Sequence, residues 1–215
     1  MPTSIEIFDD LNHETVLQTR RAMGFPIFTG AFDLMFTLFR TSEGVGEIID
    51  DNHFNDVETV LYNAGDGKSL ILEKFWCTTD PGLTGLLKPE NHQGCAILAE
   101  GYNKSAWKLG LHTGKRALVQ CAPIWIFRDN DRTNKLSFNG NPRQVTGTGI
   151  DNHRCREDRI VQYVDDFSHG CCSVPNFRDM ERILFLMEKQ RSIGLGDKVS
   201  FGLVNEPHIV WTRGA

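Results

Sequence analysis

The sequence predicts a mainly β protein, built as an antiparallel sandwich or barrel-like sheet with one main helix. Short runs of apolar, aromatic and β-branched residues recur with turn signals about every 8–12 residues, a spacing typical of all-β sandwiches and barrels. One longer segment near the C-terminus instead repeats its apolar residues at helical spacing. The 215 residues suffice to bury a sizeable core, and no repeat or linker divides them.

Residues 1–30 are expected to form an N-terminal extension. Apolar residues within Leu11–Met23 predict a short helix there, and Gly24-Phe25-Pro26 would end it. The first strands of the sheet are predicted at Leu34–Phe39, Val57–Tyr62 and Ser69–Trp76. The last two of these flank a turn rich in glycine and aspartate, so we expect them to pair as a hairpin.

Four shorter strands are predicted next, at Cys95–Ala99, Trp107–His112, Ala117–Gln120 and Ile124–Phe127. The main helix should follow, because Phe177, Met180, Leu184 and Met187 are spaced to share one helix face. A closing strand is predicted at Lys198–Val204, and residues 206–215 are expected to form a tail. Residues 31–205 therefore constitute the predicted domain.

The composition narrows the class of protein. The net charge is −5 and the pI is about 5.8, whereas a nucleic-acid-binding protein usually carries a basic patch, so no nucleic-acid partner is predicted. No run of about 18 apolar residues occurs, so no membrane insertion is expected. The N-terminus lacks a basic region followed by an apolar stretch, which predicts synthesis in the cytoplasm without a signal peptide. The six cysteines form no CxxC motif and are expected to be reduced thiols.

The stretch Phe167–Val174 holds the residues best suited to chemistry. It contains His169, Gly170 and the adjacent pair Cys171 and Cys172, and His153 lies 18 residues upstream of Cys171. A thiol with a nearby imidazole is the minimum set for a cysteine nucleophile and its general base. Gly170 would allow a tight turn that exposes the thiol. Backbone N–H groups of this turn would form an oxyanion hole, and the N-terminus of the following helix would favour the thiolate.

Two other interpretations of these residues remain open. His153, His169, Cys171 and Cys172 have the side chains of a zinc site, although adjacent cysteines are poorly spaced for tetrahedral ligation. The same residues are alternatively structural, and Cys172 in particular is expected to be a buried core residue.

The segment Ser168-His169-Gly170-Cys171 resembles the SHGC signature of the L,D-transpeptidase catalytic-domain family. His153 stands where that family carries its upstream catalytic histidine. Further segments resemble a phage-encoded and bacterial branch of the family that acts on peptidoglycan, and the resemblance extends over residues 33–204. These segments are Ala106–His112, Ala117–Gln120, Arg128-Asp129-Asn130 and Gly149–Arg154.

The resemblance implies an L,D-transpeptidase type of fold, with Cys171 as the nucleophile and His153 as the general base. It implies oxyanion-hole N–H groups from Gly170 and Cys171, and it places Ser168 and His169 in the wall of the site. The two departures from the family pattern are Ser173, where an arginine or asparagine is usual, and Arg154, where a glycine or serine is usual. Both positions are expected near the substrate. His112 and Trp107 are also expected to line the cleft. A solvent-facing or core position is the alternative for His112, and a core position is the alternative for Trp107.

The third member of the catalytic triad is open between a backbone carbonyl and Asp151. No metal or other cofactor is predicted. The expected activity is cleavage or exchange of amide bonds in peptidoglycan stem peptides through a Cys171 thioester, with hydrolysis favoured over transfer. The place of action would be the bacterial cell wall or periplasm, reached with a phage particle or lysis machinery. The alternatives are an L,D-transpeptidase that cross-links the wall, a zinc-dependent hydrolase, and a non-catalytic wall-binding or particle protein.

Overall fold

The computed structural model of the protein describes residues 4–41, 52–66, 69–145, 147 and 149–212. Its helices are α1 (Ser4–Asp10), α2 (His13–Ala22), α3 (Leu83–Leu87) and α4 (Phe177–Ser192), with a 3₁₀ turn at Glu206–His208. The strands up to the middle of the chain are β1 (Met35–Arg40), β2 (Asp56–Asn63), β3 (Leu70–Cys77), β4 (Cys95–Leu98), β5 (Gly101–His112) and β6 (Lys115–Gln120). The later strands are β7 (Ile124–Asp129), β8 (Arg143–Val145), β9 (Asn152–Arg154), β10 (Cys172–Val174) and β11 (Lys198–Asn205).

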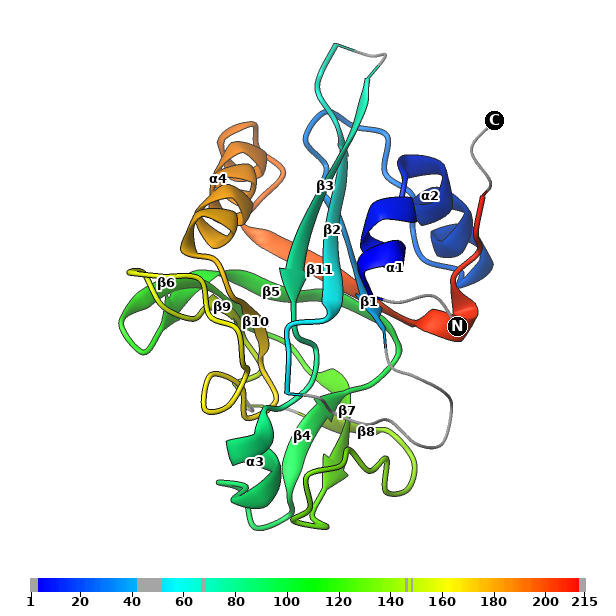
Figure 1. The fold of residues 1–215 in the computed structure, drawn as a ribbon. Helices are drawn as coiled ribbons and strands as arrows, with labels where there is room; N and C mark the ends of the chain where they lie inside the picture. Colours follow the sequence, from blue (N-terminus) through cyan, green and yellow to red (C-terminus); the bar gives the residue numbers. More distant parts are fainter. Residues whose placement is uncertain (1–3, 42–51, 67–68, 146, 148, 213–215) are drawn as a thin grey trace.

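The main sheet has eight strands in the order β10-β9-β6-β5-β11-β1-β2-β3 (Figure 1). It is mixed rather than antiparallel, since β1 pairs with β11 and β9 pairs with β10 in parallel. The predicted antiparallel sheet is corrected at these two pairs. Both need long crossovers, and alternation of residues along a strand does not reveal its partner's direction. The predicted hairpin of β2 and β3 is confirmed.

The two edges of the main sheet nearly meet. Just beyond β3, the N–H of Thr78 donates to the carbonyl of Ser173 in β10 at 2.9 Å, and the N–H of Ser173 donates back to the carbonyl of Thr78 at 3.1 Å. These two hydrogen bonds almost close the sheet on itself. They also hold β10, and with it the residues around Cys171, against the opposite edge.

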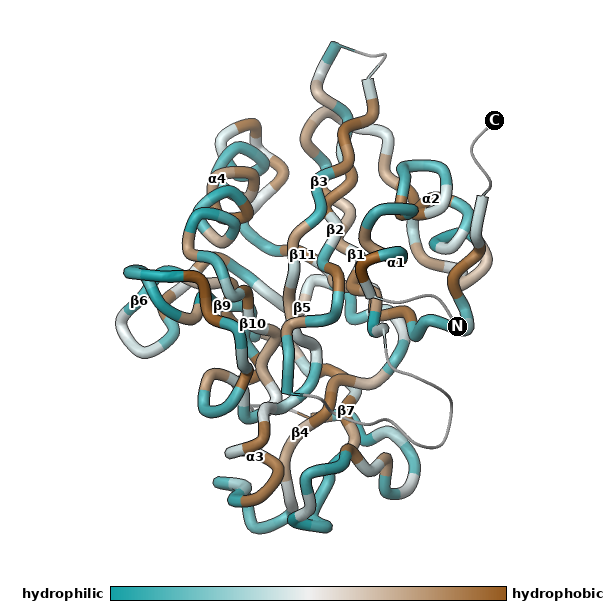
Figure 2. The backbone as a smooth tube through the Cα atoms, in the orientation of Figure 1, coloured by the Kyte–Doolittle hydropathy of each residue, from teal (hydrophilic) through white to brown (hydrophobic). Residues whose placement is uncertain are grey.

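A second, three-stranded sheet in the order β4-β7-β8 lies beside the nearly closed sheet (Figure 1). Figure 2 shows hydrophobic stretches along β4 and β7. The buried side chains of Leu98 and Ile126 belong to the main core, and that of Ile97 packs in a smaller cluster with Leu86 and Leu136. Strand β4 pairs antiparallel with β7, so that Ala96 lies opposite Arg128. This small sheet supplies one wall of the cavity described below.

The core lies between the main sheet and α4. The helix predicted from apolar spacing is confirmed, because Met180, Leu184 and Met187 are all fully buried, and Figure 2 shows hydrophobic and hydrophilic residues alternating along it. Inside the sheet, the ring of Phe201 stacks between those of Phe36 and Trp107. Such buried aromatic rings contribute about 1.5–3 kcal/mol each through apolar burial.

The N-terminal segment packs on the same sheet rather than standing apart from it. The predicted helix begins at His13, two residues later than expected, because Asn12 caps it by accepting the N–H of Thr15. Arg20 is fully buried and donates to the carbonyls of Pro26 and Phe36. A second core cluster joins these helices to the strands, with members Ile7, Leu11, Val16, Leu17, Phe25, Met35, Phe39, Val57, Leu61, Val204 and Ile209.

Candidate active site

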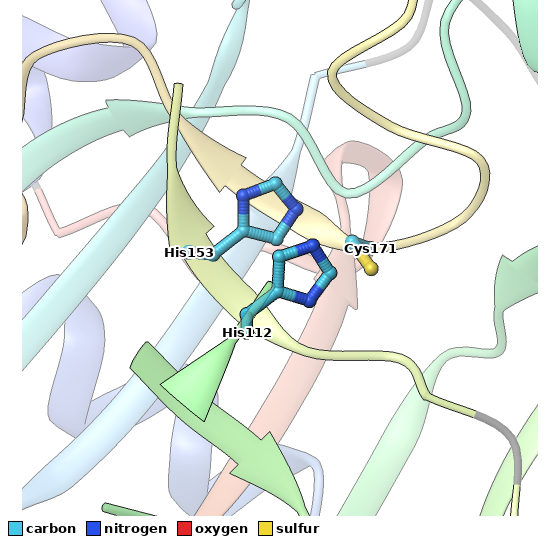
Figure 3. Close-up of side chains that lie close together, drawn as sticks. All are labelled: His112, His153 and Cys171. Carbon is cyan, nitrogen blue, oxygen red and sulfur yellow. The ribbon is translucent and has the colours of Figure 1, made fainter. Parts of the chain in front are cut away.

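The parallel pair β9 and β10 brings the predicted catalytic residues together. Ser173 lies opposite His153 in this pair, and Cys171 directly precedes β10. His112, the last residue of β5, reaches the same point, as Figure 3 shows. One nitrogen of each histidine and the sulfur of Cys171 all lie within 4.8 Å of one another. The three side chains line a cavity of about 630 Å³.

The Cys171 thiol is buried and protonated at rest. It is 8% exposed, donates to the carbonyl of Gly149 at 3.3 Å and accepts the N–H of Asp151 at 3.4 Å. Burial raises its pKa to about 12, only partly opposed by the Asp151 N–H. The expected help from a helix N-terminus is absent, because α4 begins at Phe177, beyond β10, and a helix dipole acts only within about its first turn.

His153 is held as a neutral imidazole. Its Nδ1 lies 2.9 Å from the carbonyl of Arg154, and its Nε2 lies 3.2 Å from the hydroxyl of Ser173. That hydroxyl also lies 3.1 Å from the carbonyl of Phe167, so its single hydrogen serves one of the two acceptors at a time. Burial, and then the neighbouring His112, lower the pKa of His153 to about 4. At neutral pH this ring is therefore unprotonated, and burial makes it a weak base.

His112 forms a second imidazole–acid pair at the same point. Its Nδ1 lies 2.8 Å from Oδ2 of Asp151, and the other carboxylate oxygen accepts the N–H of Gln120 at 2.8 Å. The ring of His112 stacks on that of His153, with centroids 4.1 Å apart and planes 4° from parallel. The two candidates for the third triad member thus support different imidazoles: the carbonyl of Arg154 contacts His153, and Asp151 contacts His112.

The turn before Cys171 depends on glycine. Gly170 has φ of +121°, and a Cβ there would lie 2.5 Å from the carbonyl oxygen of Ala96, which confirms the tight turn expected at this position. The Gly170 N–H donates to the hydroxyl of Ser168 at 3.1 Å, so in this conformation it is directed into the loop. Ser168 itself is 1% exposed. The expectation that it lines the wall is corrected, because its hydroxyl bonds the backbone of Asp80 and Cys171.

Two other predicted contacts fall outside the cavity. Trp107 is fully buried, stacks on Phe201 and donates its indole N–H to the carbonyl of Ile150 at 2.7 Å. It therefore supports the segment before His153 from the core and does not line the cavity. The side chain of Arg154 pairs with Glu157 at 2.9 Å and lines a separate cavity of about 370 Å³. Only the backbone carbonyl of Arg154 belongs to the site.

His169 lines the cavity, as expected of a wall residue, and its Nε2 lies 3.0 Å from Asp166. Four charged or thiol side chains of the same cavity were not expected there from the sequence: Glu90, Cys95, Arg128 and Asp166. Arg128 donates to the carbonyl of Gly94 at 2.9 Å, and in the described part of the chain it has no ion-pair partner. Its signal in the sequence was its place in a segment that resembles the family branch.

The group His112, His153 and Cys171 has the donor set of a zinc site. Its geometry fits a metal poorly. The lone pairs of an imidazole lie in the ring plane, and two planes that are stacked 4° from parallel do not converge on one ion. Both nitrogens of His153 and one of His112 already have protein partners. The adjacent Cys172 is fully buried in the core, as predicted, and cannot join such a site.

Comparison of the chain with protein-family models, with curated proteins and with solved structures finds no match. Among the described residues, no helix is long and apolar enough to span a membrane.

Proposed function

We propose that the protein cleaves or exchanges amide bonds of peptidoglycan stem peptides through a thioester on Cys171, in an L,D-transpeptidase-like fold. One observation carries the proposal: the Cys171 thiol and two imidazoles lie within 4.8 Å of one another on a cavity of about 630 Å³. A thiol and a neutral imidazole this close are the parts needed for nucleophilic acyl transfer, once they move to hydrogen-bond distance. The motif from Ser168 to Cys171 supplies the argument for the substrate class.

In the first half-reaction, the thiol turns away from the Gly149 carbonyl and gives its proton to Nε2 of His153. That nitrogen is free when the Ser173 hydroxyl donates to the carbonyl of Phe167 instead. The sulfur attacks the substrate carbonyl, and the imidazolium returns the proton to the leaving amine. Burial opposes a thiolate–imidazolium pair in the resting site, since it lowers the pKa of His153 to about 4 and raises the pKa of the thiol to about 12. The proton therefore transfers only as the sulfur bonds to the carbonyl carbon of a bound substrate. The acceptor that resolves the thioester is water for a hydrolase and an amine for a transferase, and we favour water.

The charges of the cavity suit a substrate with both kinds of charge. Arg128 offers a cation to a carboxylate, and Glu90 and Asp166 offer carboxylates to an ammonium group. Stem peptides carry both groups. The contrasting alternative, a non-catalytic wall-binding protein, gives no role to a neutral imidazole beside a thiol.

The decisive experiment is digestion of purified sacculi by the wild type and by Cys171→Ala, with released peptides identified by mass spectrometry. Loss of the nucleophile should reduce release by at least about 10³-fold. Cys121→Ala is the matched control, because Cys121 lies outside the residues that line the cavity, and it should release peptides normally. Undiminished release by Cys171→Ala would refute the proposal, and released products would identify the bond and the acceptor.

A further inference from the structure

The His112–Asp151 pair has no role in the first half-reaction. Asp151 fixes the ring of His112 through Nδ1 at 2.8 Å and is itself fixed by the N–H of Gln120 at 2.8 Å. An imidazole oriented in this way by a carboxylate is the arrangement that enzymes use for a general base, because the carboxylate sets the tautomer and stabilises the imidazolium. Such a pair beside a nucleophile calls for a chemical explanation.

The two imidazoles differ in their access to the cavity. His153 is 7% exposed, and both of its nitrogens have protein partners. The side chain of His112 is 28% exposed and lines the cavity. Within the described residues its Nε2 has no hydrogen-bond partner. A molecule that enters the cavity after the first product leaves therefore meets the Nε2 of His112 before it meets His153.

We propose that His112, oriented by Asp151, is the general base of the second half-reaction, in which it deprotonates the acceptor that resolves the Cys171 thioester. This inference rests on the proposed thioester chemistry. The O–H or N–H bond of the acceptor breaks and its proton passes to Nε2 of His112. The acceptor forms a bond to the thioester carbonyl carbon, and the C–S bond breaks with its electron pair left on sulfur. The imidazolium of His112 then returns the proton to the Cys171 thiolate.

The stacking of the two rings fits this division of work. Two imidazolium charges 4.1 Å apart would repel each other strongly in a buried site. Only one ring of the pair therefore carries an added proton at a time. His153 is protonated during acylation and must return its proton to the leaving group before His112 takes one from the acceptor. The stack thus keeps the two half-reactions in sequence.

The test measures the lifetime of an acyl group on Cys171. The protein is acetylated with p-nitrophenyl acetate, freed of reagent by gel filtration, and followed by whole-protein mass spectrometry as the acetyl group is lost. His112→Gln should still become acetylated, and the acetyl-enzyme should persist about 10²-fold longer than in the wild type. Asp151→Asn should lengthen the lifetime by a smaller factor, and added imidazole should shorten it again in His112→Gln.

His208→Gln is the matched control, because His208 forms a similar pair with Glu100 at 2.8 Å and neither residue lines the cavity. The lifetime of the acetyl-enzyme of this variant should equal that of the wild type. An unchanged lifetime of the acetyl-enzyme in His112→Gln would overturn the inference. A substitution that slows acetylation and deacetylation by the same factor would also overturn it. Acetylation that persists in Cys171→Ala would overturn the thioester chemistry as well. Wild-type protein that resolves its acetyl group through His112 but leaves sacculi intact would refute only the peptidoglycan substrate.

Discussion

At the scale of single residues, the site depends on a backbone conformation that only one amino acid tolerates. Gly170 has φ of +121° and lies against the carbonyl of Ala96 in β4. It thereby sets the distance between the loop before β10 and the second sheet. A side chain there adds both backbone strain and a steric clash. The position of the Cys171 thiol therefore depends on this contact.

We predict that Gly170→Ala lowers the free energy of unfolding by about 3 kcal/mol and reduces acetylation of Cys171. Urea unfolding and the acetylation rate would measure the two effects. Gly194→Ala separates strain from clash, because Gly194 has φ of +89° but no atom within 4 Å of a built Cβ. It should cost about 1 kcal/mol and leave acetylation unchanged. Equal effects of both substitutions would contradict the role of the Ala96 contact.

At the scale of elements, strand β9 is fixed to the far side of the sheet by a buried acid. Both oxygens of Glu58 in β2 lie 2.8 Å from Nδ2 of Asn152, the residue before His153. Burial raises the pKa of Glu58 to about 7, although the Asn152 hydrogen bond opposes the shift. Asn152 Oδ1 is a buried acceptor without a partner among the described residues. If the Asn152 amide turns over, Oδ1 takes the place of Nδ2 beside Glu58, and a protonated Glu58 then donates to it.

This pKa predicts a pH-dependent stability. Because the folded-state pKa lies above the unfolded value of 4.5, the folded state favours the protonated acid. The contribution of Glu58 to the free energy of unfolding is complete below about pH 4.5 and is lost as the pH rises to about 7. The whole change is about 3 kcal/mol at most. Glu58→Gln should remove this part of the pH dependence in urea unfolding between pH 4.5 and 8.

The comparison must be made against the wild type at each pH, since burial also raises the pKa of Asp56 and gives a background common to both proteins. Glu14→Gln is a suitable control, because the side chain of Glu14 is 46% exposed, and it should leave the pH dependence unchanged. A wild-type curve that runs parallel to that of Glu58→Gln would show that Glu58 stays ionised in the folded protein.

At the scale of the whole molecule, the N-terminal helices belong to the core rather than to an extension. The side chains of Ile7, Leu11 and Val16 are at most 2% exposed and pack on strands β1 and β2. Residues beyond β11 reach the same layer, since the hydroxyls of Thr15 and Thr212 lie 2.7 Å apart. The boundaries expected near residues 30 and 206 therefore do not separate independent parts.

We predict that a chain shortened to begin at Ala31 has a Tm lower by more than about 10 °C, because it exposes several apolar side chains worth about 1.5–3 kcal/mol each. Thermal unfolding followed by circular dichroism would measure the change. Ile5→Ala is the control, because Ile5 is 64% exposed, and its Tm should match that of the full chain. An unaltered Tm in the shortened chain would restore the interpretation of residues 1–30 as an extension.

How much of this could be predicted from the sequence depends on the range of the interactions. The main helix, the hairpin and the strands from Leu34 to Phe127 follow from local patterns of apolar residues. The three-residue strands β8, β9 and β10 do not, because so short a segment has no period, and its structure comes from partners far along the chain. The parallel pairs were missed because the alternation of residues along a strand does not reveal the direction of its partner.

The site shows the same division. Motif and spacing identified Cys171 and His153, and the structure places them together. The stack of His112 on His153 arises where β5 passes the loop before β10. The inward position of Arg128 arises where β7 passes the same loop. The position of Trp107 stayed open between cleft and core, because an aromatic residue on a strand has the same sequence signal whichever face it occupies.

The near-closure of the main sheet has a consequence for the time course of folding. Ser173 makes the two backbone bonds to Thr78 and also contacts His153 through its hydroxyl. Contacts between residues so distant in sequence form late, because the chain must first lose the entropy of a long loop. We therefore expect the contacts between Thr78 and Ser173 to form after the β9–β10 pair, in which Ser173 and His153 lie only 20 residues apart. The sheet then closes on a pair of strands that already holds Cys171 beside His153.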